Sequence, residues 1–127
     1  MAGRFPLYTN NDVRRKLVKA LRRAGWDVVR SVDTLPEDTP DPKHFEKALE
    51  LGRVLITNDQ PLVDNAHQWT EEGRRFKGMV TWPRAHYRRM TIGDLVRKFE
   101  ELAAKDQPFD PDYPIARIKP DWLSSSL

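Results

Sequence analysis

The stretch Arg53-Val54-Leu55-Ile56-Thr57-Asn58-Asp59 decides the fold of this chain. Its apolar run is nearly continuous, which is typical of a strand buried on both faces of a parallel sheet. Gly52 before it is a helix-ending residue, and Asn58-Asp59 at its end is a turn signal. A strand covered on both faces needs a helix layer on each side, so this stretch predicts an α/β fold.

The same alternation of strand and helix extends to both sides of this central strand. Short apolar runs rich in β-branched residues predict strands, and apolar positions spaced by three or four residues predict helices. The expected strands cover 5–8, 26–32, 53–57 and 79–82, and the expected helices cover 13–24, 42–50, 61–72 and 92–103. With right-handed crossovers, this order predicts a parallel sheet of about four strands between two helix layers.

Residues that favour helix starts precede the expected helices. The run from Thr9 to Asp12 consists of residues that cap helices well, and Asp41-Pro42 and Thr91 mark two later starts. We expect Asp12 and Asp41 to act as caps. Asp59 is as consistent with a cap as with a functional carboxylate.

Composition bounds the class of protein. The chain has 127 residues and no cysteine, so one domain of ordinary size is expected and thiolate chemistry is excluded. Its apolar runs are far shorter than the ~20 residues of a membrane helix, and its first residues lack a signal-peptide pattern. We therefore expect a soluble cytoplasmic protein without membrane contact.

Proline spacing divides the chain into two parts. Prolines at 108, 111, 114 and 120 exclude a continuous helix there, which predicts a domain over 1–104 and an extended arm over 105–127. The aromatic residues Phe109, Tyr113 and Trp122 predict that this arm packs on the domain.

Charge is segregated along the chain, although the formal net charge is only +3. One helix carries a run of basic residues without an acid between them: Arg14, Arg15, Lys16, Lys19, Arg22 and Arg23. Such a surface suits a polyanion such as RNA, because binding of each phosphate releases counterions. The alternative is an ordinary solvated helix face.

Acidic and amide residues follow the expected strands. In open parallel sheets the functional site lies beyond the carboxyl ends of the strands, which predicts that Asn10, Asp12, Asp41 and Asp59 gather at one edge. Carboxylates that lie close together repel one another unless a cation lies between them, and a divalent cation with oxygen ligands is the usual solution. None of the three histidines, His44, His67 and His86, has metal-ligand spacing, so we interpret them as surface or packing residues.

Three segments of this chain are similar to a family of small bacterial PIN-like proteins. The matching residues are Asn10 to Val13 with Arg15-Lys16-Leu17, Ala20-Leu21, Gly25 and Asp27-Val28; Asp41 with Ala48 and the run from Gly52 to Asp59; and Gly78-Met79-Val80 with Ile92-Gly93-Asp94-Leu95. The resemblance covers roughly residues 5–103.

This resemblance implies a PIN-like three-layer fold related to the VapC-type toxin ribonucleases. In that family clustered acids bind Mg²⁺ or Mn²⁺ for phosphodiester hydrolysis, so Asp59, Asp41 and Asp12 become the expected metal ligands and Asn10 a further catalytic residue. The expected RNA-binding residues are the basic ones of the first long helix: Arg14, Arg15, Lys16, Lys19 and Arg22.

Two departures from the family pattern leave alternatives open. The family has aspartate where this chain has Asn10, and a second acid shortly after Asp59 where this chain has Pro61. One hypothesis is therefore a metal-dependent ribonuclease, in which Asp12 compensates for Asn10. The other is a PIN-like module without catalysis that binds nucleic acid or a protein. An acidic antitoxin-like partner and a homodimer are further hypotheses.

Overall fold

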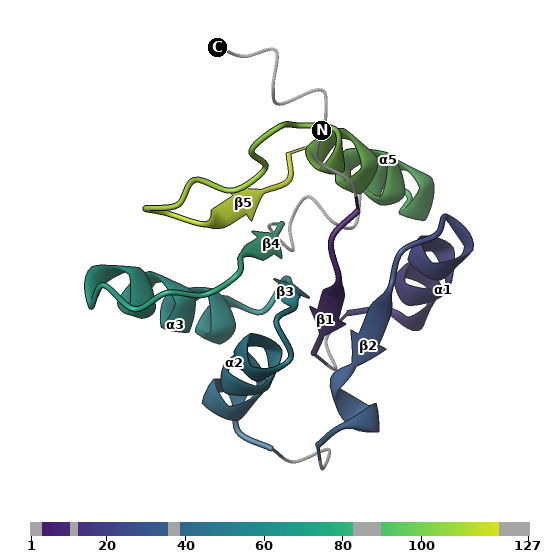
Figure 1. The fold of residues 1–127 in the computed structure, drawn as a ribbon. Helices are drawn as coiled ribbons and strands as arrows, with labels where there is room; N and C mark the ends of the chain where they lie inside the picture. Colours follow the sequence, from purple (N-terminus) through teal and green to yellow (C-terminus); the bar gives the residue numbers. More distant parts are fainter. Residues whose placement is uncertain (1–3, 11–12, 36–38, 83–89, 120–127) are drawn as a thin grey trace.

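The computed structural model describes residues 4–10, 13–35, 39–82 and 90–119, without the side chains of Asp41 and Pro42. Five strands, four α-helices and one 3₁₀ helix follow one another along this part of the chain (Figure 1). In order they are β1 (Leu7–Thr9), α1 (Arg15–Arg23), β2 (Val28–Arg30), η1 (Ser31–Asp33), α2 (Asp41–Glu50), β3 (Val54–Thr57), α3 (Gln60–Glu71), β4 (Met79–Thr81), α5 (Ile92–Ala103) and β5 (Ile115–Arg117).

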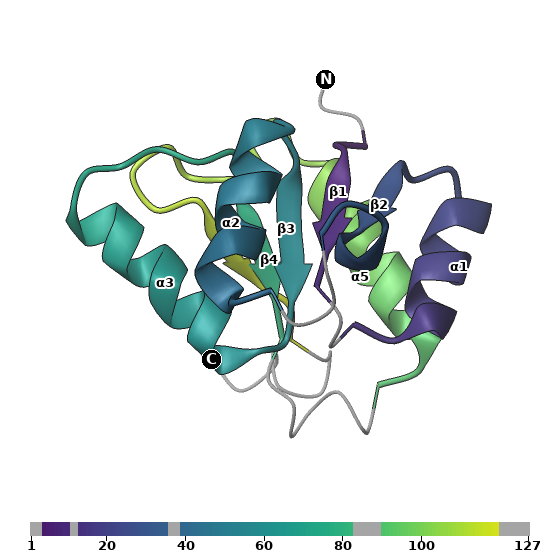
Figure 2. The same ribbon diagram turned by 90° about the horizontal axis from the view of Figure 1, so that it is seen from below.

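The five strands form one parallel sheet in the order β2-β1-β3-β4-β5. Helices α1 and α5 cover one face, and α2 and α3 cover the other, so the layers are those of an α/β/α sandwich (Figures 1 and 2). All four helices begin at the edge where the strands end (Figure 2). The α/β class and the parallel sheet are confirmed, whereas the expected count of about four strands is one too low.

The additional strand, β5, lies in the proline-rich segment that was expected to be an extended arm. Its three residues follow Pro114 directly and pair with β4. Earlier in the same segment, the ring of Phe109 lies against Gly78 and packs edge-on against Phe5, with ring centroids 5.1 Å apart. The packing expected for Phe109 is thus confirmed, while Trp122 lies outside the described residues.

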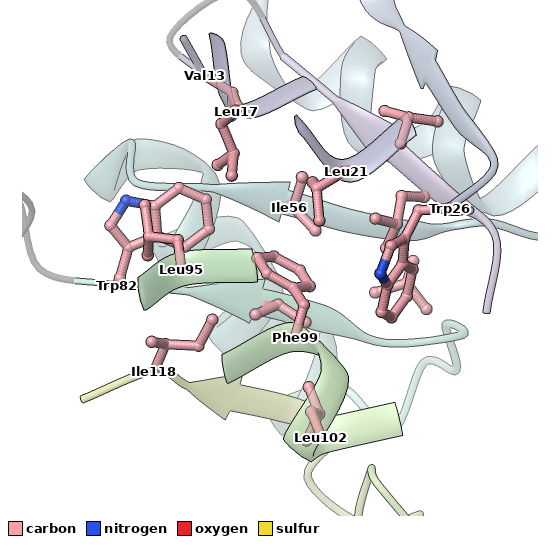
Figure 3. Packing of buried hydrophobic residues seen from close by; sticks show 14 of the residues in the cluster. Val13, Leu17, Leu21, Trp26, Ile56, Trp82, Leu95, Phe99, Leu102 and Ile118 are labelled. Atoms are coloured by element: carbon pink, nitrogen blue, oxygen red, sulfur yellow. The ribbon is translucent and has the colours of Figure 1, made fainter. Parts of the chain in front are cut away.

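A first core fills the space between the sheet and helices α1 and α5. The apolar stripe expected on α1 is confirmed, since Leu17 and Leu21 are fully buried. Phe99 of α5 packs edge-on against Trp26 and Trp82, with centroids 5.7 and 6.1 Å away (Figure 3). These rings join α5 to the end of β4 and to the turn between α1 and β2.

A second core lies under α2 and α3. Phe45 of α2 is its centre, because the ring packs edge-on against Trp69 of α3 at 4.6 Å and against Phe76 at 5.0 Å. On the sheet, Tyr8, Leu55 and Met79 complete this cluster. β3 thus contributes to both cores, as expected of a strand buried on both faces.

One expected cap is wrong, one is confirmed, and one lies outside the described residues. The N-cap of α2 is Pro40, so Asp41 does not occupy the cap position. The N-cap of α1 is Arg14, and Asp12 lies outside the described residues. Thr91 begins α5 with a complete capping box to Asp94.

The strand expected at 26–32 is shorter, because residues 31–33 form the 3₁₀ helix η1. In the described part of the chain, no helix is long and apolar enough to cross a membrane.

The carboxylate of Glu100 on α5 joins the first residues of the described chain to the first core. Arg4 donates two hydrogen bonds of 3.0 Å to it, and the Trp26 indole Nε1 donates a third. The hydrogen bond from Arg4 lowers the pKa of Glu100, burial opposes this effect, and the Trp26 hydrogen bond adds to it. A carboxylate whose pKa is lower in the folded state stabilises the fold at pH values above its pKa in the unfolded chain. This stabilisation is lost as the pH falls through the pKa in the folded state.

We therefore expect Glu100→Gln to lower the free energy of unfolding by less than about 1 kcal/mol at neutral pH, because the carboxylate is partly exposed to solvent. The difference from the unaltered protein should shrink on acidification below the ordinary glutamate pKa of 4.5. Urea unfolding at several pH values measures it. Glu71→Gln, at an exposed position at the end of α3, is the control. A difference that persists at low pH would contradict the pKa explanation.

Candidate functional site

The sheet face under α2 and α3 changes from apolar to polar toward the ends of the strands. Tyr8, Leu55 and Met79 form an apolar row across β1, β3 and β4. Two residues further along, the same register places Asn10, Thr57 and Thr81 side by side. All three are buried, with at most 6% of their surface exposed. We call Asn10, Thr57 and Thr81 the polar row.

Hydrogen bonds join the polar row to Asp59. The Thr57 hydroxyl donates to Asn10 Oδ1 at 3.1 Å and accepts from the backbone N–H of Asp59 at 3.0 Å. One hydroxyl therefore fixes the amide of Asn10 and the backbone of Asp59 relative to each other. The structure thus brings together two of the residues predicted for the site, from segments 49 positions apart in the sequence.

Asp59 is in the N-cap position of α3, but its side chain makes no cap hydrogen bond. Its backbone carbonyl accepts from the N–H groups of Leu62 and Val63, as in an ordinary first turn. The sequence leaves Asp59 as either a helix cap or a functional carboxylate. Because its side chain makes no cap hydrogen bond, the capping alternative is wrong for this side chain. The carboxylate lies at the end of the central strand, where the fold concentrates polar groups.

The two other predicted acids are placed less completely. Asp41 is the first residue of α2, so its backbone lies at the edge where the strands end. Its side chain and the whole of Asp12 lie outside the described residues. The convergence of Asp12, Asp41 and Asp59 therefore stays a prediction. Within the residues that the structure does describe, no group of three or more acidic or histidine side chains could hold a metal ion.

Two buried polar atoms near this edge have no hydrogen-bond partner in the described part of the chain. They are Oδ1 of Asn58, which is next to Asp59, and Nδ1 of His44, one turn into α2. A buried polar atom without a partner costs free energy, and in native proteins water or a bound group usually satisfies it. His44 is only 4% exposed, so its interpretation as a packing residue is confirmed.

Sequence reasoning missed that Thr57 and Thr81 belong to the polar row and that Oδ1 of Asn58 is buried without a partner in the described part of the chain. Thr57 and Thr81 end apolar strands and carry no motif of their own. The available signal was positional, because both are polar residues at the point where a buried strand ends. His67, by contrast, lies away from the polar row, and its Nδ1 is 2.8 Å from the Tyr113 hydroxyl.

The basic residues predicted to bind RNA lie along α1 and do not have equivalent roles. Arg15, Lys16 and Lys19 are exposed, and the described residues offer no ion pair to them. Arg22 instead donates a 2.8 Å hydrogen bond to the carbonyl of Val28 in β2. The first turn of α1, with Arg15 and Lys16, lies at the same edge of the sheet as the polar row (Figure 2).

We expect Thr57→Val to lower the free energy of unfolding by about 1–3 kcal/mol, because it leaves Asn10 Oδ1 and the Asp59 N–H buried without a partner. The matched control is Thr70→Val, which removes a hydroxyl that, among the described residues, bonds only to the carbonyl of His67 in its own helix. Chemical denaturation of both variants measures the difference. Equal stability of the two variants would show that the link between Asn10 and Asp59 is not important.

Comparisons with known proteins add no relative from which a function could be transferred. Protein-family models, curated proteins and solved structures gave no match to this chain. The functional proposal therefore rests on the chemistry of the polar row, of Asp59 and of the α1 surface.

Proposed function

We propose that this chain is a PIN-like, cytoplasmic ribonuclease that depends on Mg²⁺ or Mn²⁺ and uses Asp59 as its central ligand. One observation carries the proposal: Asp59 lies two residues after the end of the central strand, its side chain makes no cap hydrogen bond to α3, and its backbone N–H is joined through Thr57 to Asn10. A carboxylate on a backbone fixed in this way, at the edge where parallel strands end, is suited to bind a ligand.

The side-chain oxygens near this edge are of the chemical kind that a hard divalent cation prefers. Mg²⁺ and Mn²⁺ prefer oxygen ligands, and such oxygens are present in the Asp59 carboxylate and in the side chains of Asn10 and Asn58. The oxygen of Asn58 is buried and accepts no hydrogen bond within the described chain, which is the condition that a cation or a water would relieve. Asp41 and Asp12 would supply further negative charge.

When bound, such a cation polarises a phosphate and lowers the pKa of a water ligand. The residues of this chain have distinct tasks around it. Thr57 keeps the Asn10 oxygen and the backbone of Asp59 in place. Arg15, Lys16 and Lys19 attract the RNA backbone to the side of the molecule where the strands end.

We expect the purified protein to cleave single-stranded RNA with Mn²⁺ or Mg²⁺ and to lose this activity in EDTA. Asp59→Asn should lower the rate by about 100-fold or more, because loss of a direct ligand should exceed the 10–100-fold effect of outer-sphere partners. Asp64→Asn is the matched control, since Asp64 is exposed on α3 and bonds to Gln60. Gel assays of labelled RNA measure the rates.

Two results would count against the nuclease. One is intact RNA with either metal, and the other is equal activity of the Asp59→Asn and Asp64→Asn variants. Folding of both variants is checked by circular dichroism, so that a lost activity can be assigned to the carboxylate.

The second candidate is a PIN-like module that binds RNA without cleaving it. Asn10 favours this candidate, because the residue is neutral, buried and already hydrogen-bonded to Thr57. A neutral ligand in place of an acid weakens cation binding. Pro61, in place of a second family acid, lies in the first turn of α3 and offers no side-chain ligand. An acidic antitoxin-like partner for α1 and a homodimer stay predictions.

For both candidates we expect RNA binding through α1, and for the second this binding persists in EDTA. Lys16→Glu with Lys19→Glu should weaken binding and reduce the slope of log K against log salt by roughly 1.4, given ~0.7 for each phosphate contact on a single strand. Arg75→Glu with Lys77→Glu makes the same change in net charge on a surface between α3 and β4. Fluorescence anisotropy at several salt concentrations measures both variants. Equal losses would mean that only the overall charge is important.

A further inference from the structure

Strand β5 is the last strand of the sheet, and no strand of the described residues pairs with its outer side. The backbone groups of successive residues in β5 point alternately toward β4 and away from it. The carbonyl of Pro114 accepts from the N–H of Met79 at 2.9 Å, and the N–H of Ile118 donates to the carbonyl of Thr81 at 2.8 Å. The N–H and C=O of Arg117 therefore point away from β4. No hydrogen bond to either group is present within the described chain.

The opposite edge of the sheet is covered differently. The N–H of Leu7 donates to the carbonyl of Asp27 at 2.8 Å, so the carbonyl of Val28 points away from β1. Arg22 of α1 donates to that outward carbonyl at 2.8 Å. At β2 a side chain thus blocks the position where another strand would pair. The described residues provide no such cover at Arg117.

Positive charge surrounds the open edge. Lys105, Arg117 and Lys119 are exposed, and none of them forms an ion pair with the described part of the molecule. Glu101 on α5 already accepts from Arg97 at 2.8 Å. The cations lie on both faces of the edge, because Arg117 shares the α3 side with Ile115 while Lys105 follows α5.

A hollow of about 200 Å³ runs beside this edge between α5 and β5. Leu102, Ala116 and Ile118 line it with apolar groups. Its charged lining residues are four basic ones, Lys98, Lys105, Arg117 and Lys119, and one acid, Glu101. It could accept alternate side chains of a chain that pairs with β5.

We propose that the open edge of β5 is a docking site for an extended, acidic segment of a partner protein, which adds a strand beside Arg117. The backbone of Arg117 would exchange hydrogen bonds with the segment, and its carboxylates would meet Lys105, Arg117 and Lys119. This inference is independent of the proposed nuclease. A second copy of this chain fits the edge poorly, since it would bring Arg117 and Lys119 of one copy against those of the other. RNA lacks the peptide groups that pair with a strand.

The first test uses a fluorescein-labelled peptide of about ten residues that alternates Glu and Val, a length sufficient to pair along the edge. We expect fluorescence anisotropy to show saturable binding that weakens with salt. The control peptide has the same sequence with N-methyl groups on alternate residues, which remove hydrogen-bond donors and keep every charge. It should bind at least about fivefold more weakly, in keeping with the loss of backbone hydrogen bonds.

The second test changes the protein. Arg117→Ala removes the charge and keeps the N–H, whereas Arg117→Pro removes both. Because this N–H does not pair with β4, proline at position 117 leaves the existing ladder intact. We expect the proline variant to bind the peptide about fivefold more weakly than the alanine variant. If the proline variant does not fold, the N-methylated peptide on the unaltered protein decides the question.

Several results would overturn the proposal. They are absence of peptide binding, equal binding of the N-methylated peptide, and equal affinity of folded proline and alanine variants. If short RNA displaces the peptide and binds the Arg117→Ala and Arg117→Pro variants with different affinities, the edge would be assigned to nucleic acid. Self-association of the Arg117→Ala variant without peptide binding would show that the charges only protect the edge against pairing.

Discussion

The parallel pairing of β3 with β1 on one side and β4 on the other is the constraint on which the structure depends. It aligns the ends of three strands at one edge and sets the register that places Asn10, Thr57 and Thr81 side by side. The same pairing buries β3 completely, so each face needs its own helix layer. The two cores and the polar row are therefore consequences of one set of backbone hydrogen bonds.

The central part of the fold was predictable because the local signals agree with one another. The apolar run at 54–57, the capping box at Thr91 and the stripe of α1 all specify the structure that forms. Strand β5 was not predictable in this way. It has only three residues, it follows a proline, and the hydrogen bonds that make it a strand come from β4, which is distant in the sequence.

The candidate site shows the same division. The ends of the expected strands predicted the positions of Asn10 and Asp59, because parallel strands end at a common edge regardless of which side chains they carry. Helix caps were predicted less well. The choice between Asp12 and Arg14, or between Pro40 and Asp41, changes when the first helical turn begins one or two residues earlier or later. The hydrogen bonds by which the Thr57 hydroxyl joins Asn10 to Asp59 could not be inferred from the sequence. They depend on the register between β1 and β3, which only the structure shows.

The position of β5 after every other element has a consequence for how the sheet is completed during synthesis. Until residues 115–117 have left the ribosome, β4 is an outer strand with buried apolar side chains and unused peptide groups. The nascent chain therefore passes through a stage in which β4 has no outer neighbour, and a chaperone that shields extended apolar segments would act at that stage.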